Sequence, residues 1–227
     1  LPLKERSFQD RSWETILFFQ KILDRLKQVR KTDLLFRFRK ALPRKRTHIL
    51  KTDIPALMGE EPFKVVANLP YYITTPILLT LLERRLPITR IVTMVQREVA
   101  ERMIALPGGR DCGALSVAVQ YYTEPRLAIE VSPRCFLPPP AVESAVMDCV
   151  VRKTPPVAVE DEKHFFRVVR AAFGQRRKTI GNALKSLGLP RDILQGALSK
   201  AGIDPLRRGE TLSLSEFAAL AGALTAK

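Results

Sequence analysis

The segment Asn68-Leu69-Pro70-Tyr71 combines groups that could hold a planar amine. Residues 63–67 read as a short buried strand of a parallel sheet, which Pro70 ends at the edge where such sheets bind ligands. The Asn68 side-chain oxygen and the Leu69 carbonyl could accept both hydrogens of an exocyclic amino group, and the Tyr71 ring could stack on the base. A turn with tyrosines that cover a sheet edge would use the same residues.

Other motifs follow this segment in a fixed order. They are Gln96-Arg97-Glu98, Gly113-Ala114-Leu115-Ser116-Val117, Gln120-Tyr121-Tyr122, Phe136 to Val146, Ala172 to Thr179 and Leu214-Ser215-Glu216-Phe217. The ordered set resembles the bacterial small-subunit (16S) ribosomal RNA adenine N6,N6-dimethyltransferase family over about residues 48–227. The resemblance implies an enzyme that uses S-adenosylmethionine to dimethylate adenine in the RNA of immature 30S subunits during ribosome biogenesis.

The resemblance also implies roles for individual residues. Tyr71 and Phe136 would form the two walls of a pocket for a flipped adenine. As an alternative, Phe136 is a core aromatic in a proline-stiffened loop. Asp53 and Asn68 would contact the cofactor. The implied catalytic segment consists of Asn68, Leu69, Pro70 and Tyr71.

The loop around Phe136 contains three consecutive prolines, 138–140, which fix φ and favour a loop that is ordered before ligand binds. Ser144 could make a local hydrogen bond that closes this loop, or it could be an ordinary serine at the start of a strand. Tyr72, next to the candidate pocket, is expected to have a structural role.

The formal net charge of +15 favours a polyanionic partner, and RNA, DNA and an anionic membrane surface all fit that sign. The cluster Arg176-Arg177-Lys178 is dense enough to neutralise phosphates. We expect it to contact the RNA backbone; a solvated helix face is the alternative.

Several classes of protein are not indicated. No apolar run reaches the roughly 18 residues that span a bilayer, so we expect a cytoplasmic protein without a membrane partner. We also expect a monomer. The three cysteines, Cys112, Cys135 and Cys149, suggest neither a disulfide framework nor a zinc site, and we expect buried thiols and no metal. The two histidines, His48 and His164, are far apart and receive no catalytic role.

Three regions are expected. A basic, divergent segment spans residues 1–46, a methyltransferase sheet domain spans 47–154, and a helical RNA-binding domain spans 155–227. The fold class is α/β, with a Rossmann-like sheet domain that is incomplete at its amino-terminal half. A strand at 144–152 is expected to be covered on both faces, and helices are expected at 162–173, 177–186, 191–201 and 214–224.

The family's glycine-rich cofactor turn has no counterpart, because Gly59 is the first glycine of the chain. We therefore expect weak binding of S-adenosylmethionine or none. A ribosomal RNA-binding assembly factor that does not methylate is one alternative. Another is a large-subunit ribosomal RNA adenine dimethyltransferase, although Gln175 to Thr179 and Leu214 to Phe217 favour the small-subunit family.

Overall fold

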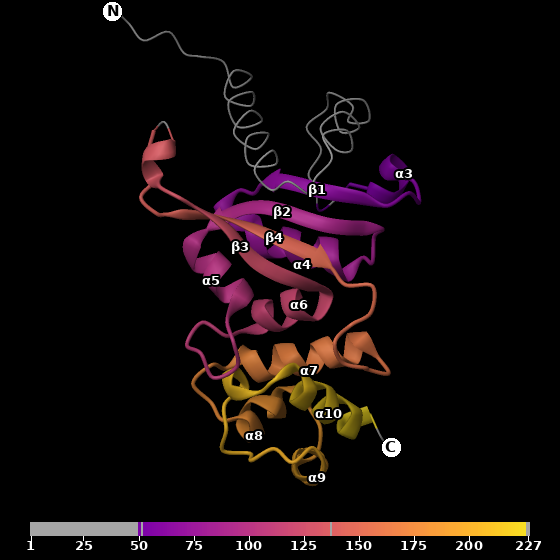
Figure 1. Ribbon diagram of the computed structural model, residues 1–227. Helices are drawn as coiled ribbons and strands as arrows, with labels where there is room; N and C mark the ends of the chain where they lie inside the picture. Colours follow the sequence, from indigo (N-terminus) through magenta and orange to yellow (C-terminus); the bar gives the residue numbers. More distant parts are fainter. Residues whose placement is uncertain (1–49, 51, 137, 226–227) are drawn as a thin grey trace, which may run out of the picture.

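The computed structural model describes residues 50, 52–136 and 138–225 of the 227-residue chain. The basic segment expected at residues 1–46 lies outside this part. Figure 1 shows a twisted sheet with helices packed against one face, and a layer of carboxyl-terminal helices beyond them.

The sheet has four strands in the order β1-β2-β4-β3. β1 and β2 pair in parallel, as the sequence predicts, because α4 connects them as a crossover; β4 pairs antiparallel with both β2 and β3. The strands are β1 (Phe63–Asn68), β2 (Ile88–Gln96), β3 (Thr123–Val131) and β4 (Ser144–Val151).

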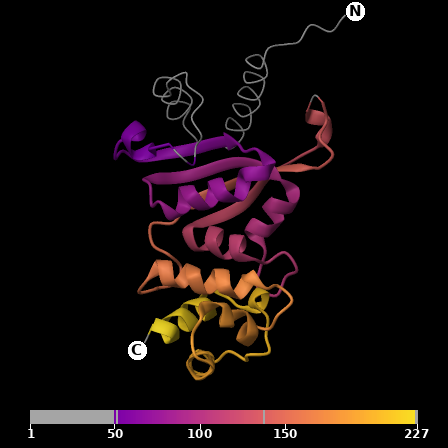
Figure 2. The same ribbon diagram turned by 180° about the vertical axis from the view of Figure 1, so that it is seen from behind.

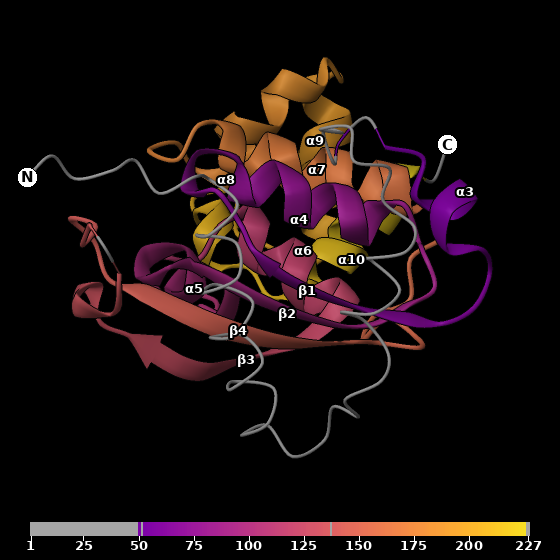
Figure 3. The same ribbon diagram turned by 90° about the horizontal axis from the view of Figure 1, so that it is seen from above.

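Helices cover one face of this sheet. They are α4 (Thr74–Glu83), α5 (Arg97–Ile104) and α6 (Ala114–Tyr122), and a short α3 (Ile54–Met58) precedes β1. Seen from above in Figure 3 and from behind in Figure 2, all three covering helices lie on the same side of the strands. On the opposite face, which no described helix covers, Val92, Met94, Val131 and Val146 form a second apolar cluster and are 4% exposed or less.

The first six residues of β4 are buried, so side chains on both faces of this strand are shielded from solvent as expected, although described helices pack on one face only and the second apolar cluster shields the other. Asp148 lies among them and is fully buried. Its carboxylate pairs with Arg126 through an Nε–Oδ2 bond of 2.8 Å and lies 3.3 Å from the Arg90 Nε. A carboxylate at this depth needs such partners, because removing an unpaired charge from water is costly.

The carboxyl-terminal part is helical, as expected, with α7 (Glu162–Gly174), α8 (Ile180–Ala183), α9 (Arg191–Lys200) and α10 (Leu214–Thr225). Asp161 starts α7, because its carboxylate accepts hydrogen bonds from the backbone N–H groups of Lys163 and His164. The helix predicted from residue 177 starts later, at Ile180, because residues 175–178 form a turn.

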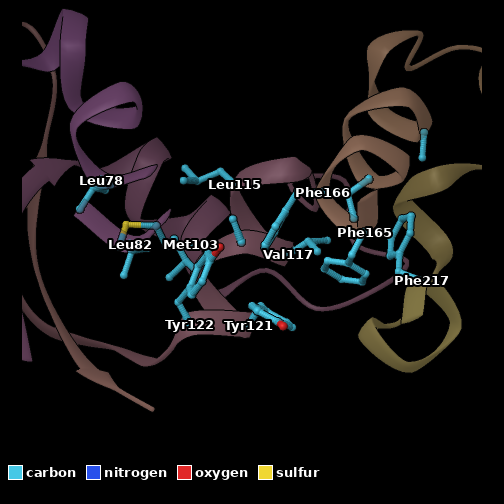
Figure 4. Close-up of a cluster of buried hydrophobic side chains, with 14 of the residues drawn as sticks. Leu78, Leu82, Met103, Leu115, Val117, Tyr121, Tyr122, Phe165, Phe166 and Phe217 are labelled. Carbon is cyan, nitrogen blue, oxygen red and sulfur yellow. The ribbon is translucent and has the colours of Figure 1, made fainter. Parts of the chain in front are cut away.

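An aromatic cluster joins the sheet to these helices (Figure 4). Tyr121 of α6 stacks on Phe165 of α7 with ring centroids 5.2 Å apart, and Tyr122 stacks on Phe166 at 5.3 Å. The Tyr122 hydroxyl also donates a 2.6 Å hydrogen bond to Glu162. The pKa of Tyr122 is raised, firstly because the side chain is buried and secondly because of this bond. One apolar core therefore continues from the sheet into the carboxyl-terminal helices.

Candidate active site

Asn68 is the last residue of β1 and lies opposite Met94 of β2. Its side chain is exposed and makes no hydrogen bond within the described part of the chain. The next residue, Leu69, is buried, and its N–H donates to the Met94 carbonyl at 3.3 Å. The strand end is thus anchored by β2, while the Asn68 amide stays available to a ligand.

Pro70 turns the chain out of the sheet with φ −60° and ψ 130°. Its carbonyl accepts hydrogen bonds from the Ile73 N–H at 3.1 Å and the Thr74 hydroxyl at 3.0 Å. These bonds hold the short 3₁₀ helix η2 (Tyr71–Ile73), which presents the two tyrosines.

The two tyrosines of this turn have different environments. Tyr71 is half-buried, and its hydroxyl lies 2.5 Å from the Ser144 hydroxyl at the start of β4. The Ser144 bond is therefore a contact between residues 73 positions apart, and not the local loop closure that the sequence suggests. Tyr72 is 87% exposed, so the structural role expected for it is wrong.

Phe136 follows the 3₁₀ helix η3 (Pro133–Cys135), and its N–H donates to the Pro133 carbonyl at 3.1 Å. The ring is half-buried and packs against the apolar cluster of the helix-free sheet face, which includes Val146. The β3–β4 loop leaves the sheet at the end where β1 finishes (Figure 1). Phe136 and Tyr71 thus come from one end of the sheet, and stacking of either ring on adenine stays a prediction.

Asp53 lies elsewhere. It precedes α3, where its exposed carboxylate accepts a 3.2 Å hydrogen bond from the Ala56 N–H, and α3 lies near the start of β1 (Figure 1). Arg84, after the last residue of α4, donates to the carbonyls of Leu50 and Thr52, both at 3.1 Å. A strand of this length spans about 17–20 Å, so the structure does not bring Asp53 to Asn68.

The described residues therefore do not form a complete cradle for S-adenosylmethionine. Asn68 offers hydrogen-bonding atoms at the strand end, whereas Asp53 lies near the other end of β1. The positive-φ glycines of the described part are Gly59, Gly108, Gly188 and Gly202, and none follows a strand at the end where Asn68 lies. What the site does offer is a pair of acceptors for an amine and a tyrosine ring beside them.

The basic cluster of Arg176, Arg177 and Lys178 is exposed and lies in the turn between α7 and α8, not on a helix face. Arg176 donates a hydrogen bond to the Arg110 carbonyl of the α5–α6 loop, so the turn is attached to the sheet domain. The same loop is held a second time, because the Gly108 N–H donates to the Glu210 carbonyl at 2.7 Å. This arrangement places the three cations where they can meet an extended polyanion.

The remaining sequence expectations concern cysteines, metals and membranes. Cys112 and Cys149 are buried as expected, but Cys135 in the β3–β4 loop is exposed. Among the described residues no group of His, Cys, Asp and Glu has the arrangement of a metal site, and no helix there is long and apolar enough to cross a bilayer.

Comparisons with known proteins define the family. The model of the ribosomal RNA adenine dimethylase family matches residues 34–225, which is most of the chain. The chain belongs to this family.

Two relatives that share one protein name narrow the comparison within this family. The "ribosomal RNA small subunit methyltransferase A" of Moorella thermoacetica is 59% identical over 162 residues, which cover 71% of this chain and 56% of the relative. The protein of that name from Geobacillus thermodenitrificans is 51% identical over 186 residues, covering 78% of this chain and 63% of the relative. The chain thus spans less than two thirds of the length of either relative.

Solved structures confirm the fold. A dimethyladenosine transferase from Plasmodium falciparum superposes with a TM-score of 0.64 at 22% identity, covering 78% of this chain and 70% of that one. The 23S rRNA methyltransferase ErmE gives a TM-score of 0.55 at 24% identity over 79% of this chain and 70% of its own. The sheet and the helices that follow it are therefore those of the Rossmann-like methyltransferase fold.

Proposed function

We propose that this chain serves the N6-dimethylation of adenine in small-subunit ribosomal RNA, with immature 30S subunits in the cytoplasm as its partner. Residues 47–154 would supply the pocket for the target base, and the helical domain of residues 155–227 would bind the RNA backbone, with the protein acting as a monomer. The observation that carries the proposal is the Asn68-Leu69-Pro70-Tyr71 turn at the end of β1, whose Asn68 amide is exposed and makes no hydrogen bond within the described part of the chain, and whose tyrosine is anchored to β4.

The chemistry of this turn follows from the properties of the target amine. The N6 lone pair of adenine is delocalised into the ring, which makes the nitrogen a poor nucleophile. When the Asn68 side-chain oxygen and the Leu69 carbonyl accept both N–H hydrogens, a pyramidal nitrogen with a localised lone pair is favoured. S-adenosylmethionine would supply the methyl group in this reaction class, its sulfur–methyl bond breaking as the nitrogen–methyl bond forms. The displaced N–H proton would go to solvent, so the turn contributes orientation only.

The basic turn supports the RNA-binding part of the proposal. Arg176, Arg177 and Lys178 are exposed on a surface attached to the sheet domain, and clustered cations gain affinity by releasing counterions from phosphates. This affinity carries no sequence information, so selection of the adenine is left to the pocket.

A second function has specific support. Asp53 does not reach Asn68, and residues 1–58 contain no glycine for a cofactor turn. A protein that binds ribosomal RNA and captures an adenine without methylating it, as an assembly factor, would need no more than the described site.

The two functions differ in cofactor binding. Titration calorimetry with S-adenosylmethionine, combined with mass spectrometry of RNA from immature small subunits, separates them. Cofactor binding together with N6-dimethyladenine in the product supports the enzyme. Salt-sensitive RNA binding without cofactor binding supports the assembly factor, and absence of RNA binding contradicts both.

Tyr71→Ala is expected to weaken capture of the target base by about 1–3 kcal/mol, because the stacking surface is lost. Tyr71→Phe keeps the ring and removes only the hydrogen bond to Ser144, so we expect a smaller effect. The measurement is the fluorescence of RNA that carries 2-aminopurine next to the target adenine, where removal of the adenine from the stack brightens the probe. Ser144→Ala is the matched control, since it removes the same bond from the other side; equal losses in Tyr71→Ala and Tyr71→Phe would contradict a stacking role.

Replacement of Arg176, Arg177 and Lys178 by glutamine is expected to weaken binding to all structured RNAs alike. The slope of log affinity against log salt should become shallower by about 2–3 units, because each phosphate contact contributes about one. Filter binding over a range of salt concentrations measures this slope. Lys163 and Lys200, exposed at other places on the helical domain, provide a control pair for substitution. An unchanged slope in the triple variant would mean that the turn is merely solvated.

A further inference from the structure

Arg97 is the first residue of α5, directly after β2, and its guanidinium faces three carboxylates. Nε lies 2.9 Å from Glu101 Oε1, Nη1 lies 2.5 Å from Glu143 Oε2, and Nη2 lies 3.9 Å from Glu130 Oε1. Glu101 belongs to the same helix, whereas the other two carboxylates come from different parts of the sheet. One side chain thus connects α5 with β3 and with the residue that precedes β4.

The two sheet contacts lie at the two ends of one loop. Glu130 is the last residue but one of β3, and Glu143 immediately precedes β4, so the loop between them contains η3 and Phe136. The backbone reinforces the second contact, because the Arg97 N–H donates to the Glu143 carbonyl at 3.0 Å. Arg97 therefore holds together the two ends of the loop that carries Phe136.

The same contact is adjacent to the tyrosine of the candidate site. Ser144, next to Glu143, is the residue whose hydroxyl lies 2.5 Å from the Tyr71 hydroxyl. The position of Glu143 thus affects both the loop with Phe136 and the anchor of Tyr71.

The stability of α5 does not explain an arginine at this position. The amino terminus of a helix favours negative charge, so a cation in its first turn is placed unfavourably with respect to the helix dipole. Removal of Arg97 would instead leave Glu101, Glu130 and Glu143 without the cation that lies among them. Their mutual repulsion would then act across the base of the loop.

We propose that Arg97 is a positioning residue that closes the base of the β3–β4 loop and thereby holds Phe136 in place at the end of the sheet where the Tyr71 turn lies. The consequence for adenine capture rests on the proposed function. The closure of the loop does not, and it can be tested in the free protein.

Cys135 provides a probe inside this loop. It is exposed, whereas Cys112 and Cys149 are buried. Burial raises the pKa of Cys149 to about 12, and burial also raises the pKa of Cys112, so both thiols are poorly reactive at neutral pH. A nitroxide attached to the native chain therefore reports on residue 135 alone.

The first experiment compares spin-label mobility at Cys135 in the native chain, Arg97→Ala and Arg102→Ala. Arg102 is the matched control, because its side chain is 43% exposed, close to the 47% of Arg97, but it pairs with Glu98 within the helix. We expect the mobile fraction to rise about three- to fivefold in Arg97→Ala, as for loss of a small network of exposed ion pairs, and to stay unchanged in Arg102→Ala. Unchanged mobility in Arg97→Ala, or an equal rise in both variants, would overturn the proposal.

Glu143→Gln keeps the size of the side chain, removes its charge and leaves α5 untouched. If Arg97→Ala destabilises the helix, this variant still tests the Arg97 clamp, by which we mean the ion pairs of Arg97 with Glu130 and Glu143. It should reproduce the rise in mobility, and Arg97→Lys should restore part of the order. A Glu143→Gln variant with native mobility would contradict the clamp.

The second experiment measures capture of the target adenine through the fluorescence of a 2-aminopurine placed next to it in RNA. Arg97→Ala should reduce the fluorescence change about threefold at saturating RNA, while the salt dependence of binding stays native, because no phosphate contact is lost. If the native chain captures no base, the proposed function fails while the spin-label result still decides the clamp. If the native chain captures the base and the Arg97→Ala loop is mobile but captures it equally well, the positioning role is wrong.

Discussion

Phe165→Ala is expected to lower the free energy of unfolding by about 3–5 kcal/mol, the usual range when a buried aromatic ring is truncated. The Phe165 side chain is fully buried, stacks on Tyr121 and meets the edge of Phe166 at a centroid distance of 5.0 Å. Because the ring is enclosed between its own helix α7 and Tyr121 of α6, the cavity left by its removal is expected to collapse only partly. Urea denaturation followed by circular dichroism measures the change.

The form of the transition is part of the same prediction. Since one apolar core runs from the sheet into α7 and α10, the native chain should unfold in a single step and Phe165→Ala should shift that step to lower urea. Ile193→Ala on α9 is the control, because this side chain is 48% exposed and its truncation should change stability by no more than about 0.5 kcal/mol. Two separate transitions in the native chain would show that sheet and helices are independent units.

The elements with a strong local pattern could be predicted from the sequence. β1 and β4 are mostly apolar, with Lys64 and Asp148 as their interior exceptions, and each is bounded by a proline or a polar turn, so type and limits follow from local chemistry. α7 has a capping aspartate and an apolar face, which fix its start and its orientation. For these segments propensity, pattern and packing agree.

The site could be predicted only in part, because its decisive contacts are between residues far apart in the chain. Asn68 at the end of β1 follows from the strand and the proline after it. The bond from Tyr71 to Ser144 does not, since no local pattern relates residues 73 positions apart. The clamp made by Arg97 was likewise missed, because charges near a helix start normally indicate only a solvated surface.

The position of Asp53 illustrates another limit. A short motif places a residue in the order of a family but not in space, and here the capped α3 lies near the start of β1, away from Asn68. The cluster of Arg176, Arg177 and Lys178 was correctly expected to be exposed, but a turn carries it where a helix was predicted. In both cases the residue types indicated the kind of site, but the sequence did not predict the path of the backbone that carries them.

Asn68→Ala is expected to reduce methyl transfer by about 10²-fold or more, comparable to the loss of one preorganised hydrogen-bonding group at a reacting centre. The substitution removes the side-chain acceptor at the end of β1 and leaves the Leu69 carbonyl alone to orient the amine. Affinity for RNA should stay nearly native, because phosphate contacts supply most of it. The result separates orientation of the base from binding of the nucleic acid.

A suitable assay joins the amino-terminal part of the Moorella thermoacetica relative ahead of residue 50, since the relative is 59% identical over the matched region. Incorporation of labelled methyl groups into immature small subunits is then compared between the fusion protein and its Asn68→Ala variant. Asn182→Ala on α8 is the matched control: it deletes an equivalent amide whose hydrogen-bond partner among the described residues is Thr179 at 3.1 Å, and α8 lies far from β1 in the fold. Turnover that survives Asn68→Ala at the level of Asn182→Ala would rule out the amine-orienting mechanism, because the Leu69 carbonyl alone cannot accept both hydrogens in the required geometry.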